Sequence, residues 1–215
     1  MLISHRKKFI YTKTSKTAGT SVESYFEKFC MPEGEWEFSH GREEYISATG
    51  IIGFRGTNAA SKEWRNHLSA AEIKNKIGAS IWDNYFKFCV VRNPFDKLLS
   101  GFFFNKEKNE DQDTILQFRN WLKNGGRVMD RDRYVIGDNI CMDYFIKYEN
   151  LEEGINHVCK KLELPFEPST IPKLKTGYRK KTIPINKFYD EESIQLVKSA
   201  YSFELNYFNY SMPEN

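Results

Sequence analysis

The sequence has no long hydrophobic run and no cluster of metal-binding residues. Nowhere in its 215 residues do about eighteen apolar residues follow one another, the length that a transmembrane helix needs. Its four cysteines, Cys30, Cys89, Cys141 and Cys159, lie far apart and outside any Cys/His pattern with metal-ligand spacing. The N-terminus lacks the apolar core of a signal peptide. We therefore expect a soluble, cytoplasmic protein with reduced thiols and with neither a metal nor a membrane partner.

A large excess of one charge is missing as well. The 32 basic residues nearly balance the 29 acidic residues, for a formal net charge of +3. Nothing global argues for a nucleic-acid partner or for an anionic membrane surface, so any anion site must be local. A chain of this length with 40% hydrophobic residues can bury one sizeable core. We expect a single domain over residues 1–215, and nothing in the sequence indicates an oligomeric state.

The first candidate anion site lies in a strand, loop and helix pattern near the N-terminus. The β-prone residues 9–12 lead into small and hydroxyl residues 13–20, and apolar residues then follow at helical spacing over residues 22–29. Such a loop binds phosphate because free N–H groups and the positive end of the helix dipole converge there. The lysine of a Walker A loop follows its second glycine, whereas Lys16 precedes Gly19. This order argues against ATP or GTP hydrolysis; an ordinary strand–helix turn with a surface lysine is the competing interpretation.

A second strand, turn and helix pattern begins at residue 86. The apolar run 86–91 ends at Arg92, and Asn93 followed by Pro94 is typical of a helix start. In P-loop nucleotide hydrolases a corresponding strand ends in an aspartate that helps to hold Mg²⁺. Arg92 instead suits a second phosphate, because a guanidinium pairs bidentately with phosphate oxygens. Ser100, about two turns into the helix, is a candidate donor to the same phosphate, with a packing serine as the competing interpretation.

The remaining elements alternate in a way that predicts the fold class. Ser69 and Glu72 form a capping-box pattern for a helix that should end at Gly78, and His67 lies in the loop just before it. Further helices are predicted over residues 113–122, over 151–162 and from residue 190, with strands near 51–52 and over 144–148. Alternating strands and helices predict an α/β fold, with a mostly parallel central sheet flanked by helices.

In this order the motifs resemble sulfotransferases that use 3′-phosphoadenosine 5′-phosphosulfate (PAPS). Residues 15–21 resemble the loop that holds the 5′-phosphosulfate, and residues 91–100 resemble the segment that binds the 3′-phosphate. Three further stretches are similar to the carbohydrate-type, or family 2, branch: residues 67–74, 145–151 and 183–192. Many relatives have a proline before the loop lysine, where this sequence has Ser15. The resemblance implies a P-loop-like sulfotransferase fold.

The resemblance also implies roles for particular residues. Lys16 would stabilise the bridging oxygen during in-line displacement, without a metal. The residues implied to bind the 5′ end of PAPS are Lys16, Thr17, Ala18, Gly19, Thr20 and Ser21. Arg92 and Ser100 would hold the 3′-phosphate. A basic run around Gly177 would be a loop over the donor, with Arg179 and Lys180 as candidate 3′-phosphate ligands; a solvated basic loop is the competing interpretation.

Transfer to a hydroxyl also requires a base for its proton. Histidine is the first choice near neutral pH, and His67 matches the family's histidine. Glu23, one turn into the first helix, is the second candidate. A histidine that only caps or packs at the helix start is the competing interpretation for His67.

The acceptor implied by the resemblance is a carbohydrate hydroxyl, or that of a small molecule. Two other functions stay open. A kinase-like phosphotransferase would need Mg²⁺ and ATP, which the position of Lys16 and the absence of a strand-end aspartate disfavour. A non-catalytic nucleotide-binding protein of the same fold is disfavoured because Lys16 and Arg92 are both present.

Overall fold

The computed structural model describes residues 1–105, 113–172, 174 and 183–213. The chain divides into two compact units, one of residues 1–91 and 130–174 and the other of residues 92–129 and 175–215. The expectation of a single domain over residues 1–215 stays a prediction. Arg179 and Lys180 lie outside the described residues. Among the residues that are described, no helix is long and apolar enough to cross a membrane.

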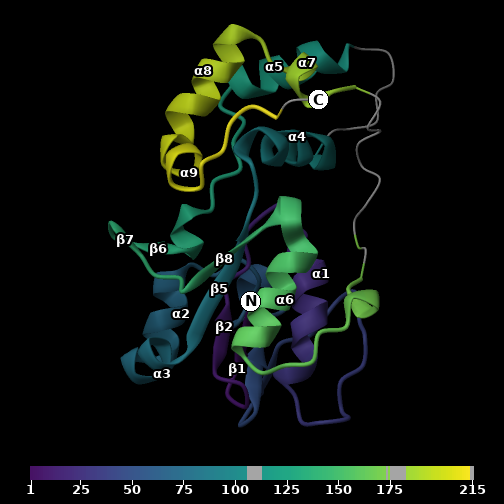
Figure 1. The fold of residues 1–215 in the computed structure, drawn as a ribbon, viewed down its shortest axis with the longest axis vertical. Coiled ribbons are helices and arrows are strands. Elements are labelled where there is room, and N and C mark those ends of the chain that lie inside the picture. The colour runs from purple at the N-terminus through teal and green to yellow at the C-terminus, as the bar shows by residue number, and fades with distance from the viewer. Residues whose placement is uncertain (106–112, 173, 175–182, 214–215) are drawn as a thin grey trace. The chain divides into compact units, whose positions relative to one another are not determined.

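The first unit is built on a six-stranded sheet with the order β3-β4-β1-β2-β5-β8. Figure 1 labels β1, β2, β5 and β8 of this sheet. The strands are β1 (Leu2–Ser4), β2 (Phe9–Tyr11), β3 (Tyr45–Ser47), β4 (Gly50–Ile52), β5 (Phe86–Val91) and β8 (Tyr144–Lys147). β5 pairs in parallel with β2 and β8, but β1 runs antiparallel to both β2 and β4, and β3 antiparallel to β4. The sheet is therefore mixed, and the prediction of a mostly parallel sheet was wrong.

The antiparallel part contains β4, which was predicted near residues 51–52, and two strands that the sequence pattern did not reveal, β1 and β3. β1 has only three residues, too few to show a period, and it is buried throughout. A tight connection with Lys8 at a φ of 50° returns the chain into β2, and so short a connection can join only antiparallel strands. β3 and β4 form a second hairpin of the same kind. The parallel β2–β5–β8 part carries both predicted strand–turn–helix motifs.

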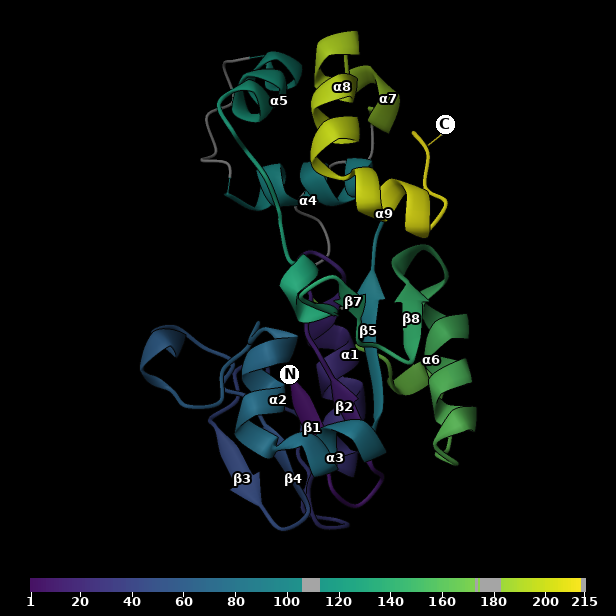
Figure 2. The ribbon, with the colours of Figure 1, turned by 90° about the vertical axis from the view of Figure 1, so that its left-hand side faces the viewer.

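Helices cover both faces of this sheet. α1 (Gly19–Phe26) and α6 (Leu151–Lys161) lie on one face, and α2 (Ala70–Ile77) and α3 (Ala79–Asn84) lie on the other. Figure 2 shows α2 and α3 in front of the strands and α1 behind them. A small hairpin of β6 (Val135–Ile136) and β7 (Asn139–Ile140) also belongs to this unit. Within the described ranges the short 3₁₀ helices are η1 (Glu27–Phe29), η2 (Ala59–Ser61), η3 (Arg131–Arg133), η4 (Tyr148–Asn150) and η5 (Pro168–Thr170).

Alternation along the strands assigns side chains to the two faces. Phe9 and Tyr11 of β2, with Phe88 of β5, join one buried cluster with residues of α1 and α6. Ile10 lies between the first two and is also buried, although it does not belong to that cluster. Successive side chains of a strand point to opposite faces of the sheet. Because both faces are buried here, every residue of β2 is apolar or aromatic. β2 therefore holds the loop that follows it on a rigid, doubly covered sheet.

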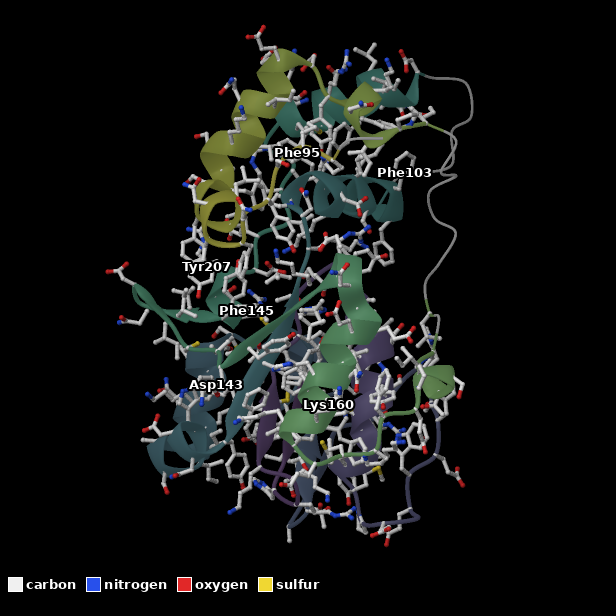
Figure 3. The ribbon with its side chains drawn as sticks, viewed as in Figure 1. Phe95, Phe103, Asp143, Phe145, Lys160 and Tyr207 are labelled. Atoms are coloured by element: carbon white, nitrogen blue, oxygen red, sulfur yellow. The ribbon has the colours of Figure 1, made fainter. Side chains whose placement is uncertain are left out.

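The second unit is helical. Its helices are α4 (Pro94–Asn105), α5 (Thr114–Lys123), α7 (Ile185–Phe188), α8 (Glu191–Ala200) and α9 (Ser202–Tyr207). Phe95 and Phe103 lie on α4 (Figure 3), and they pack edge-on against Tyr189 and Phe188. Phe188 and Tyr189 also pack against Phe118 of α5. Aromatic edge-to-face packing therefore joins the helices of this unit.

The predicted cap of α2 is present and yields a first test. The Ser69 hydroxyl accepts from the Glu72 amide at 3.2 Å, and the Glu72 carboxylate accepts from the Ser69 amide at 2.8 Å. We expect Ser69→Ala to lower the free energy of unfolding by about 1 kcal/mol, measured by urea denaturation, because a helix amide loses its partner. Ser80→Ala, at an exposed position of α3, is the matched control and should change stability little. Equal losses in the two variants would contradict the capping role.

Candidate functional site

The loop between β2 and α1 combines backbone strain with an uncapped helix start. Lys16 and Ala18 have φ values of 61° and 56°, a left-handed conformation that non-glycine residues adopt at a cost. Ala18 stands at the N-cap position and contributes no side-chain hydrogen bond. The amide N–H groups that open α1 are therefore not occupied by a capping side chain, which is the arrangement that binds anions at helix N-termini.

The loop is held in this conformation by contacts on several sides. The Thr14 and Thr17 hydroxyls lie 2.8 Å apart, and Thr14 also donates to the Val90 carbonyl of β5. The Ser15 amide donates to the Asp130 carboxylate at 2.7 Å, and Asp130 is buried. These contacts fix the backbone before a ligand arrives, which lowers the entropy that binding must overcome.

The side chains of the predicted donor loop differ in exposure. Lys16 is half-buried. Thr17, Thr20 and Ser21 are buried, and the Ser21 hydroxyl accepts from the Leu174 amide at 3.3 Å. Residues 16–18 thus end the loop, and residues 19–21 form the first turn of α1.

His67 lies beside this loop, in the first unit. Its Nδ1 is 3.0 Å from the Lys13 carbonyl oxygen, and its backbone has a φ of 62°. A carbonyl oxygen can only accept a hydrogen bond, so Nδ1 carries the proton and Nε2 carries the lone pair of the neutral ring. Burial, followed by the nearby charge of Lys13, lowers the pKa of His67 to about 4. The imidazole is therefore neutral at pH 7, with its basic nitrogen directed away from the Lys13 carbonyl.

Glu23, the second candidate base, lies in a buried ion-pair cluster. It is fully buried and contacts the Lys13 ammonium, the Met1 amino group and, at 3.2 Å, the Arg55 guanidinium. Burial alone would raise the pKa of Glu23, but the charges of Lys13, the Met1 amino group and Arg55 lower it to about 2. The carboxylate is thus held ionised by cations on several sides.

A second buried carboxylate, Glu27, extends this cluster toward the loop of residues 36–42. It contacts Arg55 and accepts from Arg42 at 3.2 Å and from the Trp36 indole at 3.3 Å. The Arg55 guanidinium in turn donates to the carbonyls of residues 39 and 40, at 2.8 Å each. One arginine therefore links both carboxylates to the backbone of a neighbouring loop.

The residues predicted to hold the 3′-phosphate lie in the second unit. Arg92 donates from Nε and Nη2 to one Asp96 oxygen, at 2.9 and 2.6 Å, which orients its guanidinium along the first turn of α4. Ser100 is half-buried, one turn farther along α4 from Asp96. The Asn93 side chain accepts from the Phe95 amide at 3.1 Å, as expected for the cap of this helix.

Sequence reasoning identified the loop and His67 but gave no role to Lys13, Asp130 or Arg55. Lys13 was recognised as a loop residue, but the direction of its side chain could not be inferred from the sequence. Asp130 and Arg55 are separated from the loop by long stretches of chain, and no local pattern marks them. A buried charge beside a predicted anion loop becomes apparent only once the chain is folded.

Comparison with known proteins identifies the family of the chain. The sulfotransferase family model matches residues 1–211, and the chain belongs to that family, which confirms the resemblance drawn from the sequence. An uncharacterized protein of Archaeoglobus fulgidus is 33% identical to this chain over 105 residues, which are 46% of this chain and 86% of that protein. No solved structure matches the chain significantly.

The low pKa of His67 predicts a dependence of stability on pH. The folded pKa of about 4 lies below the ordinary value of 6.5, so the stabilisation is complete above pH 6.5 and is lost as the pH falls toward 4. We expect unfolding midpoints of His67→Gln to fall less over this range than those of the unchanged protein. His157→Gln, at an exposed position of α6, is the control and should follow the unchanged protein. A His67 pKa near 6.5 by nuclear magnetic resonance titration would contradict the assignment.

Proposed function

We propose that this sulfotransferase moves a sulfuryl group from PAPS to an acceptor hydroxyl by in-line displacement. The observation that carries the proposal is the uncapped start of α1, behind a strained loop that contains Lys16. A helix N-terminus supplies several N–H donors and a positive dipole to one anion. A sulfonate carries less negative charge than a phosphoryl group, so we propose that charge stabilisation by the protein suffices without a metal.

In this proposal the loop residues hold the 5′ end of the donor. The amides at the start of α1 and the hydroxyls of Thr20 and Ser21 bind the 5′-phosphate. Lys16 stabilises the charge that develops on the bridging oxygen as its bond to sulfur breaks. Arg92 and Ser100 hold the 3′-phosphate, with Asp96 keeping the guanidinium oriented. Arg179 and Lys180 stay candidate ligands from the sequence alone.

The surroundings of the two candidate bases favour His67 over Glu23. A base must be unprotonated but basic enough to take the hydroxyl proton. Glu23 has a pKa of about 2 and is enclosed by cations, which makes its carboxylate a weak base. The neutral His67 presents Nε2, and the negative charge of a bound donor raises an imidazole pKa toward neutrality. We therefore assign proton removal to His67.

We also propose an acceptor class and a compartment. The similarity to the family 2 branch supports a carbohydrate hydroxyl as the acceptor. In the described part of the chain Cys30, Cys89, Cys141 and Cys159 are thiols and form no disulfide, and three of them are buried, which supports a reducing compartment such as the cytoplasm.

Donor binding can be tested by calorimetric titration with 3′-phosphoadenosine 5′-phosphate in the presence of EDTA. We expect a Kd of about micromolar order, and a loss of affinity well beyond tenfold in Arg92→Ala, because a bidentate phosphate contact is removed. ATP with Mg²⁺ should bind more weakly. A preference for Mg-ATP would contradict the proposal and support a kinase-like phosphotransferase, and binding without turnover would support a non-catalytic nucleotide-binding protein.

The catalytic roles can be separated from binding by rate measurements. With an acceptor found by screening oligosaccharides, PAPS turnover is followed as release of the bisphosphate product. We expect Lys16→Ala to abolish turnover while the Kd for that product stays within roughly tenfold, because its main contribution comes in the transition state. We expect His67→Ala to lower turnover by about a hundredfold or more. An unchanged rate in His67→Ala would contradict its role as base.

A further inference from the structure

Gly19 in the donor loop leaves room for the side chain of Lys13. A Cβ atom at residue 19 would lie 2.9 Å from Lys13 Cγ, 3.0 Å from Lys13 Cε and 3.3 Å from the Thr14 carbonyl oxygen. These contacts are shorter than ordinary van der Waals separations, so a larger residue would displace the lysine stem. The φ of Gly19 is not in the range that requires glycine. The packing of Lys13 is therefore a reason for glycine at this position.

The Lys13 ammonium lies at the first turn of α1. It is ion-paired with the buried Glu23 carboxylate and is 3.4 Å from the Thr20 hydroxyl oxygen. Lys13 is almost completely buried, at 4% exposure, so its charge is little screened by solvent. The lysine thus runs from the end of β2 to the helix turn that forms the proposed phosphate site.

The direction of the hydrogen bond between Lys13 and Thr20 sets the polarity of the Thr20 hydroxyl. An ammonium can only donate, so the Thr20 oxygen accepts from Lys13. The hydroxyl hydrogen is then directed away from the ammonium, because the two positive charges repel. A hydroxyl prepared in this way is a donor, and a donor is what an anionic phosphate oxygen requires.

We propose that Lys13, fixed by Glu23, is a positioning residue that commits the Thr20 hydroxyl to donate to the donor's 5′-phosphate. The inference rests on the proposed function, because it takes the start of α1 to be the phosphate site. It gives Glu23 a role other than that of a base. Glu23 keeps the ammonium under the helix turn, and without it the flexible lysine has other rotamers available.

The change in anion affinity on removal of the Glu23 carboxylate distinguishes a positioning role from a purely electrostatic one. Removal of a carboxylate close to an anion site should strengthen anion binding if the charge alone matters. If Glu23 instead positions Lys13, its removal should weaken binding. Glu27 is a matched control, because it is equally buried on the following turn and shares Arg55 with Glu23, whereas its other described partners are Arg42 and Trp36.

The first experiment compares these two carboxylates by calorimetry with 3′-phosphoadenosine 5′-phosphate. We expect Glu23→Gln to raise the Kd by about fivefold or more and Glu27→Gln to change it by less than about twofold. Circular dichroism and thermal unfolding ensure that both variants are folded at the temperature of titration. A Kd that falls in Glu23→Gln, or that rises equally in both variants, would overturn the proposal.

The second experiment is a double-mutant cycle between Lys13 and Thr20 with the same ligand. We expect Lys13→Met and Thr20→Val each to raise the Kd by about tenfold. The double variant should bind little worse than either, because both substitutions disable the same hydrogen bond from Thr20 to the phosphate. Thr20→Ser keeps the hydroxyl and should lose less affinity than Thr20→Val. Additive losses would show that Lys13 acts on the ligand directly, and would overturn the inference alone. Failure of the unchanged protein to bind would overturn the proposed function as well.

Discussion

The geometry of the first unit depends on the ion pairs of the buried Glu23 carboxylate. Glu23 lies on α1 and is paired with Lys13, which follows β2, and with Arg55, which follows β4. A buried charge that loses one partner costs about 3–5 kcal/mol, so the three elements are constrained to keep their positions together. The hydrophobic core brings α1 onto the sheet, but apolar packing is not directional. The ion pairs add the directions that core packing lacks.

This cluster also explains how acidic side chains are tolerated beside a proposed anion site. The described contacts of Glu23 and Glu27 include three basic side chains, those of Lys13, Arg42 and Arg55. The net charge of these five side chains is therefore positive, although the chain as a whole is nearly neutral. An anion at the proposed site would meet cations that are already oriented, and fixed dipoles and charges cost no reorganisation when a ligand arrives. The low net charge of the chain thus gives no measure of its capacity to bind an anion.

The parts of the fold that could be predicted from sequence are those with local causes. Caps at Ser69 and Asn93 located α2 and α4, and helical patterns beginning at residues 113 and 190 located α5 and α8, because each signal is local to its helix. The structure adds that Asp113 and Asp190 cap the latter two helices. β1, β3, α7 and α9 were missed because elements of three to six residues are too short to show a period. Because β1 was not predicted, its antiparallel pairing with β2 and β4 was not predicted either.

The candidate site divides in the same way. The loop of residues 15–21 and His67 were visible as short motifs, but the contacts that set their chemistry join distant residues. The pairing of Ser15 with Asp130 spans 115 positions, and that of His67 with Lys13 spans 54. Side-chain direction in Lys13 depends on a missing Cβ at Gly19, which only the folded backbone reveals. Residue identity thus indicated which groups were present, whereas the tautomer of His67 and the ionisation of Glu23 required the structure.

Lys13 connects the proposed phosphate loop to the proposed base. Its carbonyl holds the Nδ1 proton of His67, and its ammonium both contacts Thr20 and contributes to the low pKa of the imidazole. A phosphosulfate bound at the loop would bring negative charge close to that ammonium and offset its effect on His67, so the pKa of the imidazole would rise. The histidine would then be a stronger base with the donor bound than without it. Basicity would thereby increase when a sulfuryl group is present to be transferred, and the free protein would keep a neutral imidazole that does not repel other cations.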